Sequence, residues 1–323
     1  MKTYFGDSIV QKLEGRIVAV QGDLEKDNLG LLDSVATLLN DRIDSIIHCA
    51  AEVKHFGEAE YFARVNVEST NRLLTFARGK EHVRFHFVST LGIPEDLALS
   101  GQWQSFTEQD AYDYSVTIEN VYTNSKLEAE KLVIRTCEEE GVAATVYRVG
   151  NLSCHSETGT FQNNINNNAF YRMLKAMLLL KKAPQVSWQV DVTPINYAGQ
   201  AISALALSND TVGKMFHICN PVQIPYEDMI GFFRQYGYDI NLEGWDQYES
   251  WLLDPHHPKD QTGLELAMAQ LEGDGAKNSI YRFACPQTTD YLQRLNVECQ
   301  VPDERFFQRL IDHAIAVDYL SKP

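Results

Sequence analysis

Short apolar runs and longer amphipathic stretches alternate along the first half of the chain. The apolar runs are rich in β-branched or aromatic residues and cover residues 16–20, 45–48, 84–89 and 143–148. Between them, apolar positions recur at helical spacing over residues 29–39, 58–78 and 122–140. Strands that alternate with helices form βαβ units and a parallel sheet. Right-handed crossovers place helices on both faces of such a sheet, so we expect a doubly wound α/β fold.

The pattern changes after residue 150. A polar loop at Asn163–Asn168 precedes a strongly apolar helix at Phe170–Lys182, and one more strand–helix–strand passage ends at Phe216–Cys219. The remainder is predicted to be mainly helical, with glycines and prolines between the helices. These helices are expected at residues 226–236, 247–253, 263–271, 288–295 and 306–319. We therefore predict a Rossmann-like domain over residues 1–220 and a smaller, mainly helical subdomain over residues 221–323.

Composition and charge exclude several classes of protein. The chain has 323 residues and is 44% hydrophobic, which is ordinary for a large globular domain. Its net charge of −16 argues against nucleic acid or an anionic membrane as a partner, because both need a basic face. No run of 18 apolar residues offers a membrane span. Six widely spaced cysteines and the lack of a secretory signal predict a cytoplasmic protein with reduced thiols and no metal site.

The strongest candidate for chemistry is Tyr122-x-x-x-Lys126 at the start of a predicted helix. Four residues make about one helical turn, so both side chains share a face. An ammonium beside a phenol lowers the pKa of the phenol, and a tyrosine tuned in this way exchanges a proton with a carbonyl oxygen. Upstream, Ser89 and Thr90 end a predicted strand, and a hydroxyl at the carboxyl end of a parallel strand lies at the ligand crevice. We expect Thr90 to hold the same oxygen.

A second match to the same spacing, Tyr171-x-x-x-Lys175, provides a control. It lies in the apolar helix that follows the polar loop, and no strand ending in Ser-Thr precedes it. We interpret Tyr171 as a packing residue. Lys175 is interpreted as a solvated charge whose aliphatic stem covers apolar surface.

Several motifs together resemble those of extended short-chain dehydrogenases/reductases. The resemblance rests first on the order of three features: a strand ending in Ser-Thr, Tyr122-x-x-x-Lys126, and a strand ending in Arg148-x-Gly. It rests also on Gly22-Asp-Leu, His48-Cys-Ala-Ala and the helical Asn66. Within that superfamily, four segments are similar to the thioester reductase domains of non-ribosomal peptide synthetases and carboxylic acid reductases. They cover residues 22–31, 48–56, 65–74 and 191–202. The resemblance runs over nearly the whole chain.

The resemblance implies a function and a site. A thioester reductase uses NADPH to release an acyl or peptidyl chain from a phosphopantetheinylated carrier protein as an aldehyde, which some relatives reduce further to an alcohol. The implied catalytic residues are Thr90, Tyr122 and Lys126. The implied cofactor-binding residues are Gly22, Asp23, Leu24, Ala50, Ala51, Asn66, Tyr122, Lys126, Val149 and Asn151. The loop over residues 150–168 and the helical tail would shape the acyl pocket and the face that docks the carrier.

Each motif taken alone has a plainer interpretation. The Gly22-Asp23 pair could be a turn, the Ala50-Ala51 pair could mark tight packing, and Asn66 could be a polar residue on a helix surface.

Four further polar residues are interpreted structurally. His48 and His217 are expected to be hydrogen-bonded structural histidines, and Asp191 and Asn196 flank a Thr-Pro turn. The family usually has an aspartate where Asn196 stands, so no role is carried over there.

Two other functions stay open. One is a nucleotide-sugar epimerase or dehydratase, which would share the Thr-Tyr-Lys set. The other is a remnant or binding subunit that docks on a carrier protein without turnover.

The glycine-rich turn that holds a dinucleotide diphosphate is missing. None of the 19 glycines forms G-x-G-x-x-G, and Gly273-Asp-Gly275 is rejected because no predicted strand precedes it. The residue that reads the 2′-phosphate of NADP would be missing too. We expect a truncated gene model, a split domain or a degenerate copy, in which the 16–20 strand either pairs with the 45–48 strand or leaves a sheet edge open.

Overall fold

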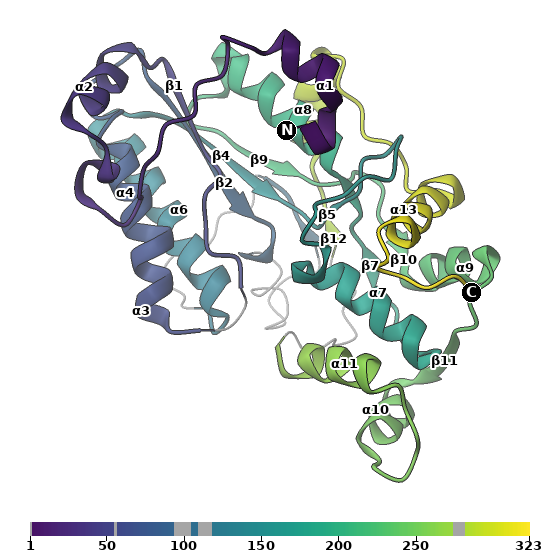
Figure 1. Ribbon diagram of the computed structural model, residues 1–323. Helices are drawn as coiled ribbons and strands as arrows, with labels where there is room; N and C mark the ends of the chain where they lie inside the picture. Colours follow the sequence, from purple (N-terminus) through teal and green to yellow (C-terminus); the bar gives the residue numbers. More distant parts are fainter. Residues whose placement is uncertain (1, 55–56, 94–104, 109–117, 274–281) are drawn as a thin grey trace.

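A parallel sheet forms the centre of the computed structural model, which describes residues 2–54, 57–93, 105–108, 118–273 and 282–323. The sheet has the order β1-β2-β4-β9, and every neighbouring pair is parallel. Its strands are β1 (Ser45–His48), β2 (Arg84–Thr90), β4 (Ala143–Val149) and β9 (Met215–Ile218). All four lie where the apolar runs predicted them (Figure 1).

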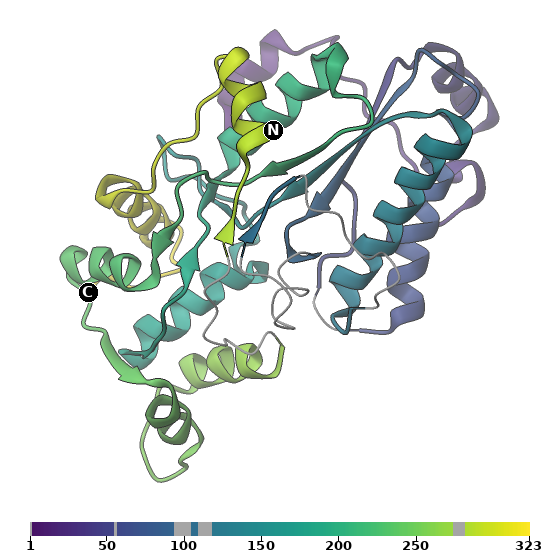
Figure 2. The same cartoon turned by 180° about the vertical axis from the view of Figure 1, so that it is seen from behind.

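Helices cover both faces of this sheet, which confirms the doubly wound, Rossmann-like class. On one face, α4 (Ser69–Leu74) and α6 (Val121–Glu140) pack on Phe85, Phe87 and alternate residues of β4. On the other, α8 (Ile195–Leu207) and α12 (Pro286–Arg294) pack on Tyr147 and on residues of β9. Figure 2 shows α6 and the yellow-green α12 on opposite flanks of the sheet. Because both faces are covered, β4 is an almost continuous buried run rather than an alternating one.

The first half also contains helices that precede α6 along the chain. The predicted helix over residues 58–78 is formed over residues 59–74, with a π-helical turn in its middle. Its parts are α3 (Ala59–Phe62), the π turn η2 (Ala63–Glu68) and α4. Before it come α1 (Lys2–Lys12), the short 3₁₀ helix η1 (Asp27–Gly30) and α2 (Asp33–Arg42).

The second half is built on a separate core. It joins α7 (Ala169–Leu180) to α9 (Tyr226–Tyr236) and α13 (Glu304–Ala316). Beside α7 lie α10 (Trp245–Leu253) and α11 (Gln261–Gly273). Short strands complete this half: β5 (Leu152–Ser153), β6 (Lys182–Gln185), β7 (Gln189–Val190), β8 (Thr193–Pro194), β10 (Ile224–Pro225) and β11 (Asn241–Gly244). The helix α7 precedes residue 220 and yet shares this core with helices that follow it. The domain boundary proposed at residue 220 stays a prediction.

Four short elements complete the described part of the chain: β3 (Ser105–Phe106), which pairs with β12 (Arg282–Phe283), and the 3₁₀ helices η3 (Ile165–Asn167) and η4 (Asn209–Thr211). No helix in the described part of the chain is long and apolar enough to cross a membrane.

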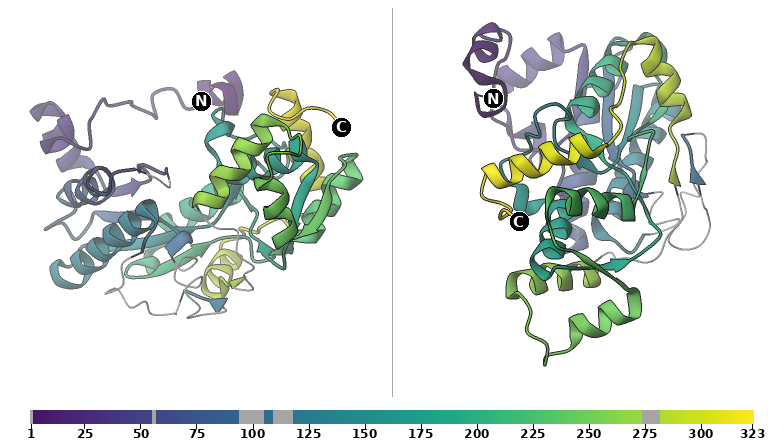
Figure 3. Two further views of the ribbon diagram at one scale, coloured as in Figure 1. Left: turned by 90° about the horizontal axis from the view of Figure 1, so that it is seen from below. Right: turned by 90° about the vertical axis from the view of Figure 1, so that its right-hand side faces the viewer.

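The strand predicted over residues 16–20 is wrong. These residues are exposed coil, with Ile17 53% and Val18 80% accessible, and Figure 3 shows them in an extended chain between α1 and α2. A β-branched run forms a strand only when a neighbour accepts its backbone hydrogen bonds. In the described sheet β1 is an edge strand and does not pair with this segment, and Ile47 of β1 is 49% exposed. The second alternative, an open edge, is therefore the one found.

A buried ion pair joins α6 to the sheet. Arg148 of β4 donates from Nε to Oε2 of Glu130 at 3.2 Å, Ser89 Oγ donates to the same oxygen at 2.8 Å, and the side chains of Arg148 and Glu130 are fully buried. The pair fixes α6, and with it Tyr122, against the strand end that carries Thr90.

Replacing Glu130 by glutamine is expected to lower the free energy of unfolding by about 3–5 kcal/mol, because it leaves the Arg148 charge buried without its carboxylate. Urea unfolding followed by circular dichroism measures the change. The control is Glu128→Gln on the same helix, where the carboxylate is 45% exposed and pairs with Lys131, so a change within about 0.5 kcal/mol is expected. Equal midpoints for both variants would contradict the assigned importance of the buried pair.

Candidate active site

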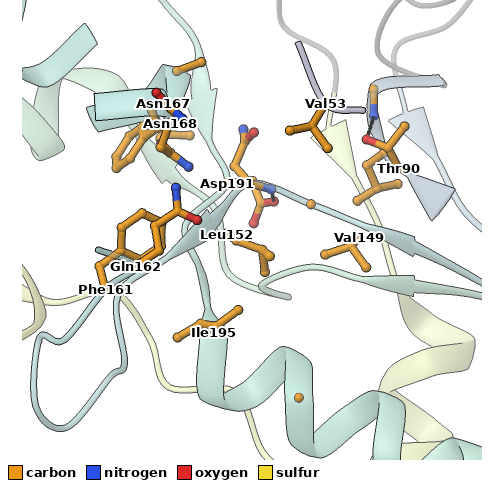
Figure 4. Close-up of a pocket in the computed structure, with 18 of the residues that line it drawn as sticks. Val53, Thr90, Val149, Leu152, Phe161, Gln162, Asn167, Asn168, Asp191 and Ile195 are labelled. Atoms are coloured by element: carbon orange, nitrogen blue, oxygen red, sulfur yellow. Dashed lines mark hydrogen bonds between the residues drawn. The ribbon is translucent and has the colours of Figure 1, made fainter. Parts of the chain in front are cut away.

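A large pocket opens at the carboxyl ends of β2 and β4, where a doubly wound sheet binds its ligands. Its volume is about 1560 Å³. Thr90, Tyr122, Val149, Asn151 and Asp191 line it. Figure 4 shows Thr90 and Val149 on one side of the pocket, with Asp191 near its middle. The structure thus brings together four residues that the sequence predicted for catalysis or cofactor binding, from three separate segments.

Thr90 and Tyr122 form the reactive corner of this pocket. Tyr122 lies in the first turn of α6, whose start is fixed by Asn120, because the side chain of Asn120 accepts a hydrogen bond from the backbone N–H of Thr123 at 3.0 Å. Both side chains line the pocket, and the Thr90 hydroxyl oxygen accepts a hydrogen bond from the backbone N–H of Gly92 at 3.0 Å. Burial raises the pKa of Tyr122, and the side chain of Thr90 acts in the opposite direction. Two groups able to hold one carbonyl oxygen therefore lie side by side.

Lys126 lies one turn further along α6 and is only 3% exposed. Its Nζ donates to the carbonyl oxygen of Val88 at 2.7 Å and lies 4.1 Å from the ring centroid of Phe87. Burial lowers the pKa of Lys126 to about 8, while the nearby Glu130 acts to raise it. The expected lowering of the Tyr122 pKa by Lys126 is not found, because burial of the phenol dominates and the ammonium is engaged with the backbone of β2.

Asn66 holds the turn after β1 against α6. Its side chain accepts from the backbone N–H of Glu52 at 2.8 Å and donates to the Glu52 carbonyl oxygen at 3.0 Å and to Ser125 Oγ at 2.8 Å. It is 1% exposed, so the interpretation as a polar residue on a helix surface is wrong. It also lies in the π turn η2, a distortion that often marks functional sites.

Asp191 fixes the backbone at the end of β4. Its carboxylate accepts from the N–H of Asn151 at 2.9 Å, from Thr193 Oγ1 at 2.8 Å and from the N–H of Asn220 at 3.2 Å. Burial raises the pKa of Asp191 to about 6, and these hydrogen bonds oppose that rise. A side chain at Gly150 would place its Cβ 2.0 Å from Asp191 Oδ2, so only glycine permits this approach.

Asn196 holds the next loop in a similar way. It accepts from the N–H of Ser156 at 2.9 Å and donates to Ser156 Oγ at 3.0 Å. The side chains of Asp191 and Asn196 therefore both accept hydrogen bonds from backbone N–H groups of loops, which agrees with their interpretation as turn residues.

The predicted adenine-side residues lie apart from the pocket wall. Gly22, Asp23 and Leu24 form an exposed or half-exposed loop in which Asp23 pairs with Lys26 at 3.3 Å and the carbonyl oxygen of Leu24 accepts from Arg72 at 3.3 Å. Ala50 and Ala51 follow β1, and neither lines the pocket.

The site has groups suited to the nicotinamide end of a dinucleotide cofactor, but the helix after β1 is poorly suited to the diphosphate. For the nicotinamide end, Tyr122 of α6 lines the pocket, while the Lys126 ammonium does not line it and lies against the Val88 carbonyl oxygen of β2. A diphosphate needs free N–H groups and a positive helix end. The helical segment after β1, however, begins after Glu58 and carries Glu60 in its first turn. Negative charge there disfavours an anion, so the start of this helical segment is a poor site for the diphosphate.

Other candidates are confirmed as structural. His48 Nε2 is hydrogen-bonded to Thr70 Oγ1 at 2.9 Å, and His217 Nδ1 is hydrogen-bonded to the Ala284 carbonyl oxygen at 3.0 Å. Tyr171 is 1% exposed and stacks on Phe161 at 4.5 Å, as the control predicted. Gly275 lies outside the described residues, as do residues 55 and 56 at the end of one family-like segment. No group of metal-ligating side chains is found within the described ranges.

Part of the pocket wall had no signal in the sequence. The helix α1, which the hydrophobic pattern did not predict, contributes Tyr4 and Ile9, and Tyr4 Oη accepts a hydrogen bond from the N–H of Asn163 at 3.0 Å. The helix α7 and the segment before β7 contribute Phe170 and Trp188. The loop over residues 150–168 also lines the pocket, and its predicted part in shaping an acyl pocket stays a prediction.

Comparisons with known proteins agree with this geometry. The model of a family described as "Male sterility protein" (NAD_binding_4) matches residues 2–202. A linear gramicidin synthase of Brevibacillus parabrevis is 27% identical over 307 residues, which are 92% of this chain and 6% of the synthase. The large subunit of the L-2-aminoadipate reductase of Candida glabrata is 27% identical over 72% of this chain and 18% of that protein. The chain thus spans a small part of these curated relatives.

Two solved structures share the fold. The terminal R domain from the myxalamid PKS-NRPS biosynthetic pathway superposes with a TM-score of 0.86 at 25% identity, covering 97% of this chain and 78% of that one. A thiolation-reductase di-domain from an archaeal non-ribosomal peptide synthetase gives a TM-score of 0.81 at 26% identity, covering 99% and 66%. The resemblance to reductase domains of non-ribosomal peptide synthetases is confirmed.

Proposed function

Because this chain belongs to the Male sterility protein family of NAD-binding domains, we propose that its pocket reduces a carrier-bound acyl or peptidyl thioester to an aldehyde with NADPH. The observation that carries the proposal is that Tyr122 and Thr90 share the wall of a 1560 Å³ pocket at the carboxyl end of β2. The relatives add support, since they include synthetases and a reductase of aminoadipate. We further propose that the carrier protein delivers its phosphopantetheine arm to this pocket, and that residues 1–220 form the cofactor-binding unit.

The chain's own residues would handle the proton. When bound, NADPH supplies a hydride to the carbonyl carbon. Tyr122 donates its proton to the carbonyl oxygen, and Thr90 holds that oxygen in place. Cleavage of the carbon–sulfur bond then expels the pantetheine thiolate. The hydroxyl proton returns to the Tyr122 phenolate as the C=O forms, and a proton from solvent reaches the sulfur, so that a free aldehyde and a carrier thiol remain.

Positioning residues would keep this corner in register. Lys126 is proposed to hold the nicotinamide ribose. Its Nζ would then donate to a ribose hydroxyl, either in addition to the Val88 carbonyl oxygen or in place of it. Asn66 would keep the turn after β1 at a fixed distance from Tyr122 through Ser125. Val149 and Asn151 would border the cofactor at the end of β4.

The test is product analysis with a carrier-bound thioester and millimolar NADPH. We expect aldehyde, free carrier thiol and oxidised cofactor in equal amounts, measured by mass spectrometry and absorbance. Carrier binding without cofactor oxidation would favour a non-catalytic docking subunit, the alternative that the missing glycine-rich turn supports. Tight binding of a UDP- or dTDP-sugar would favour an epimerase or dehydratase.

A further inference from the structure

The wall of the pocket away from Thr90 is rich in primary amides. They come from the loop before α7, from β7 and from the segment before β10: Gln162, Asn164, Asn167, Asn168, Gln189 and Gln223. Figure 4 shows Gln162, Asn167 and Asn168 grouped on the side opposite Thr90, with Asp191 between the two groups. Ligand pockets are generally dominated by apolar groups, and their few polar groups fix the orientation of the ligand.

Several of these amides are not committed to the fold. The side chains of Asn164, Asn167 and Gln189 make no hydrogen bond with any residue that the structure describes. Asn168, by contrast, accepts from the backbone N–H of Tyr171 at the start of α7, and Gln223 donates to the Phe283 carbonyl oxygen at 3.1 Å. The pocket therefore presents some amides with unused donors and acceptors, while other amides of its wall maintain local structure.

The charges of the pocket narrow the choice of ligand. Its two carboxylates are already engaged: Asp191 accepts three hydrogen bonds, and Glu52 accepts from the N–H groups of Val53 and Lys54 and from Lys54 Nζ at 3.4 Å. Arg172 adds a guanidinium to the wall. Both carboxylates of this lining are thus occupied by other donors, so a cationic chain has no unengaged carboxylate to pair with.

We propose that the pocket selects an acyl chain with backbone amides, namely an uncharged peptidyl chain, over a hydrocarbon chain of the same length. The proposal rests on the proposed function and names the class of its substrate. A primary amide has two donors and one acceptor, so it pairs with both the N–H and the C=O of a peptide unit. An alkyl chain would displace water from Asn167 and Gln189, and it could not replace the hydrogen bonds that these amides make with water. The apolar neighbours Phe170, Trp188 and Ile195 leave room for uncharged side chains.

Binding of inert probes tests the proposal without cofactor or turnover. The probes are pantetheine thioethers that carry an acetyl-dialanyl chain, or an alkyl chain with the same number of backbone atoms. Isothermal titration of the full chain is expected to give a dissociation constant roughly tenfold lower for the dialanyl probe. A third probe, whose chain ends in a lysyl amine, is expected to bind more weakly than the dialanyl probe.

Variants assign the preference to the wall. The double variant Asn167→Leu with Gln189→Met is expected to bring the two dissociation constants within about twofold of each other, mainly by weakening the dialanyl probe. The matched control is Asn166→Leu, in the same 3₁₀ turn but absent from the pocket wall, and it should keep the wild-type ratio. Circular dichroism confirms that each variant is folded.

The outcomes separate this proposal from the proposed function. Equal affinities in the wild type, no measurable affinity for either probe, or an unchanged ratio in the double variant would overturn the preference for peptidyl chains. Failure of aldehyde formation alone would overturn the proposed reaction and leave the measured preference standing, because the thioether probes are not reduced.

Discussion

Replacing Tyr122 by phenylalanine is expected to lower kcat for thioester reduction by roughly 10²–10⁴-fold, the usual contribution of one positioned general acid. The variant keeps the ring and removes only the proton donor, so KM for the thioester should change by less than about threefold. The measurement is steady-state oxidation of NADPH with a carrier-bound thioester at a saturating or highest soluble cofactor concentration.

The second tyrosine of the same spacing supplies the control. Tyr171 is buried, stacks on Phe161 and does not line the pocket, so Tyr171→Phe should keep kcat within about threefold of the wild type. A third variant, Thr90→Val, removes a hydroxyl partner of Tyr122 and should lie between the two. Retention of more than a tenth of the wild-type kcat by Tyr122→Phe would contradict the proton-donor role.

The chain by itself is expected to use reduced nicotinamide mononucleotide nearly as well as NADPH, within about tenfold in kcat/KM. Charge-assisted hydrogen bonds to a diphosphate contribute about 1.5–3 kcal/mol each, so two of them account for roughly 10²–10⁴ in affinity. The sequence has no glycine-rich turn to make them, and the helix after β1 starts beside Glu58 and Glu60. The interactions that remain for the cofactor are those at its nicotinamide end.

The same reasoning predicts weak discrimination by the 2′-phosphate. NADPH and NADH should differ by less than about tenfold, and both should need concentrations near or above about 1 mM for saturation. The variant Asp23→Ala serves as a control for the adenine side. Because Asp23 is already engaged by Lys26 and by the N–H of Glu25, the substitution should leave all three cofactors unchanged.

A saturable micromolar affinity for NADPH, followed by nicotinamide fluorescence, would contradict this expectation. It would mean that the fold builds a diphosphate site from residues other than a glycine-rich turn. A loss of that affinity in Asp23→Ala would then place the adenine at the loop over residues 22–24, where the resemblance predicted it.

Much of the fold was determined by local sequence. The strands β1, β2, β4 and β9 lie at the predicted apolar runs, and α6 spans 121–140 against a predicted 122–140. The long helix ends as predicted because Gly141 adopts φ 72°, a left-handed conformation that glycine reaches without strain. The relation of Thr90 to Tyr122 was also predictable, because the carboxyl end of a parallel strand and the start of the following helix meet at one edge of the sheet.

Tertiary structure decided what depends on partners distant in sequence. The apolar run over residues 16–20 has strand composition but lacks a ladder partner, so its backbone stays in water. Lys126 was expected to lower the pKa of Tyr122, yet its ammonium donates a hydrogen bond to the Val88 carbonyl oxygen. A buried ammonium needs a hydrogen-bond acceptor, and this backbone carbonyl provides one.

The pocket wall shows the same division most clearly. The sequence predicted a polar loop over residues 163–168 and marked Tyr122 as the candidate proton donor, and the family resemblance placed the loop over residues 150–168 at the acyl pocket. It gave no indication that Tyr4, Gln162, Trp188 and Tyr226 would share one cavity. Their meeting depends on how α1, α7 and α9 pack, and such packing is set by shape and burial between distant segments rather than by the periodicity of any one of them.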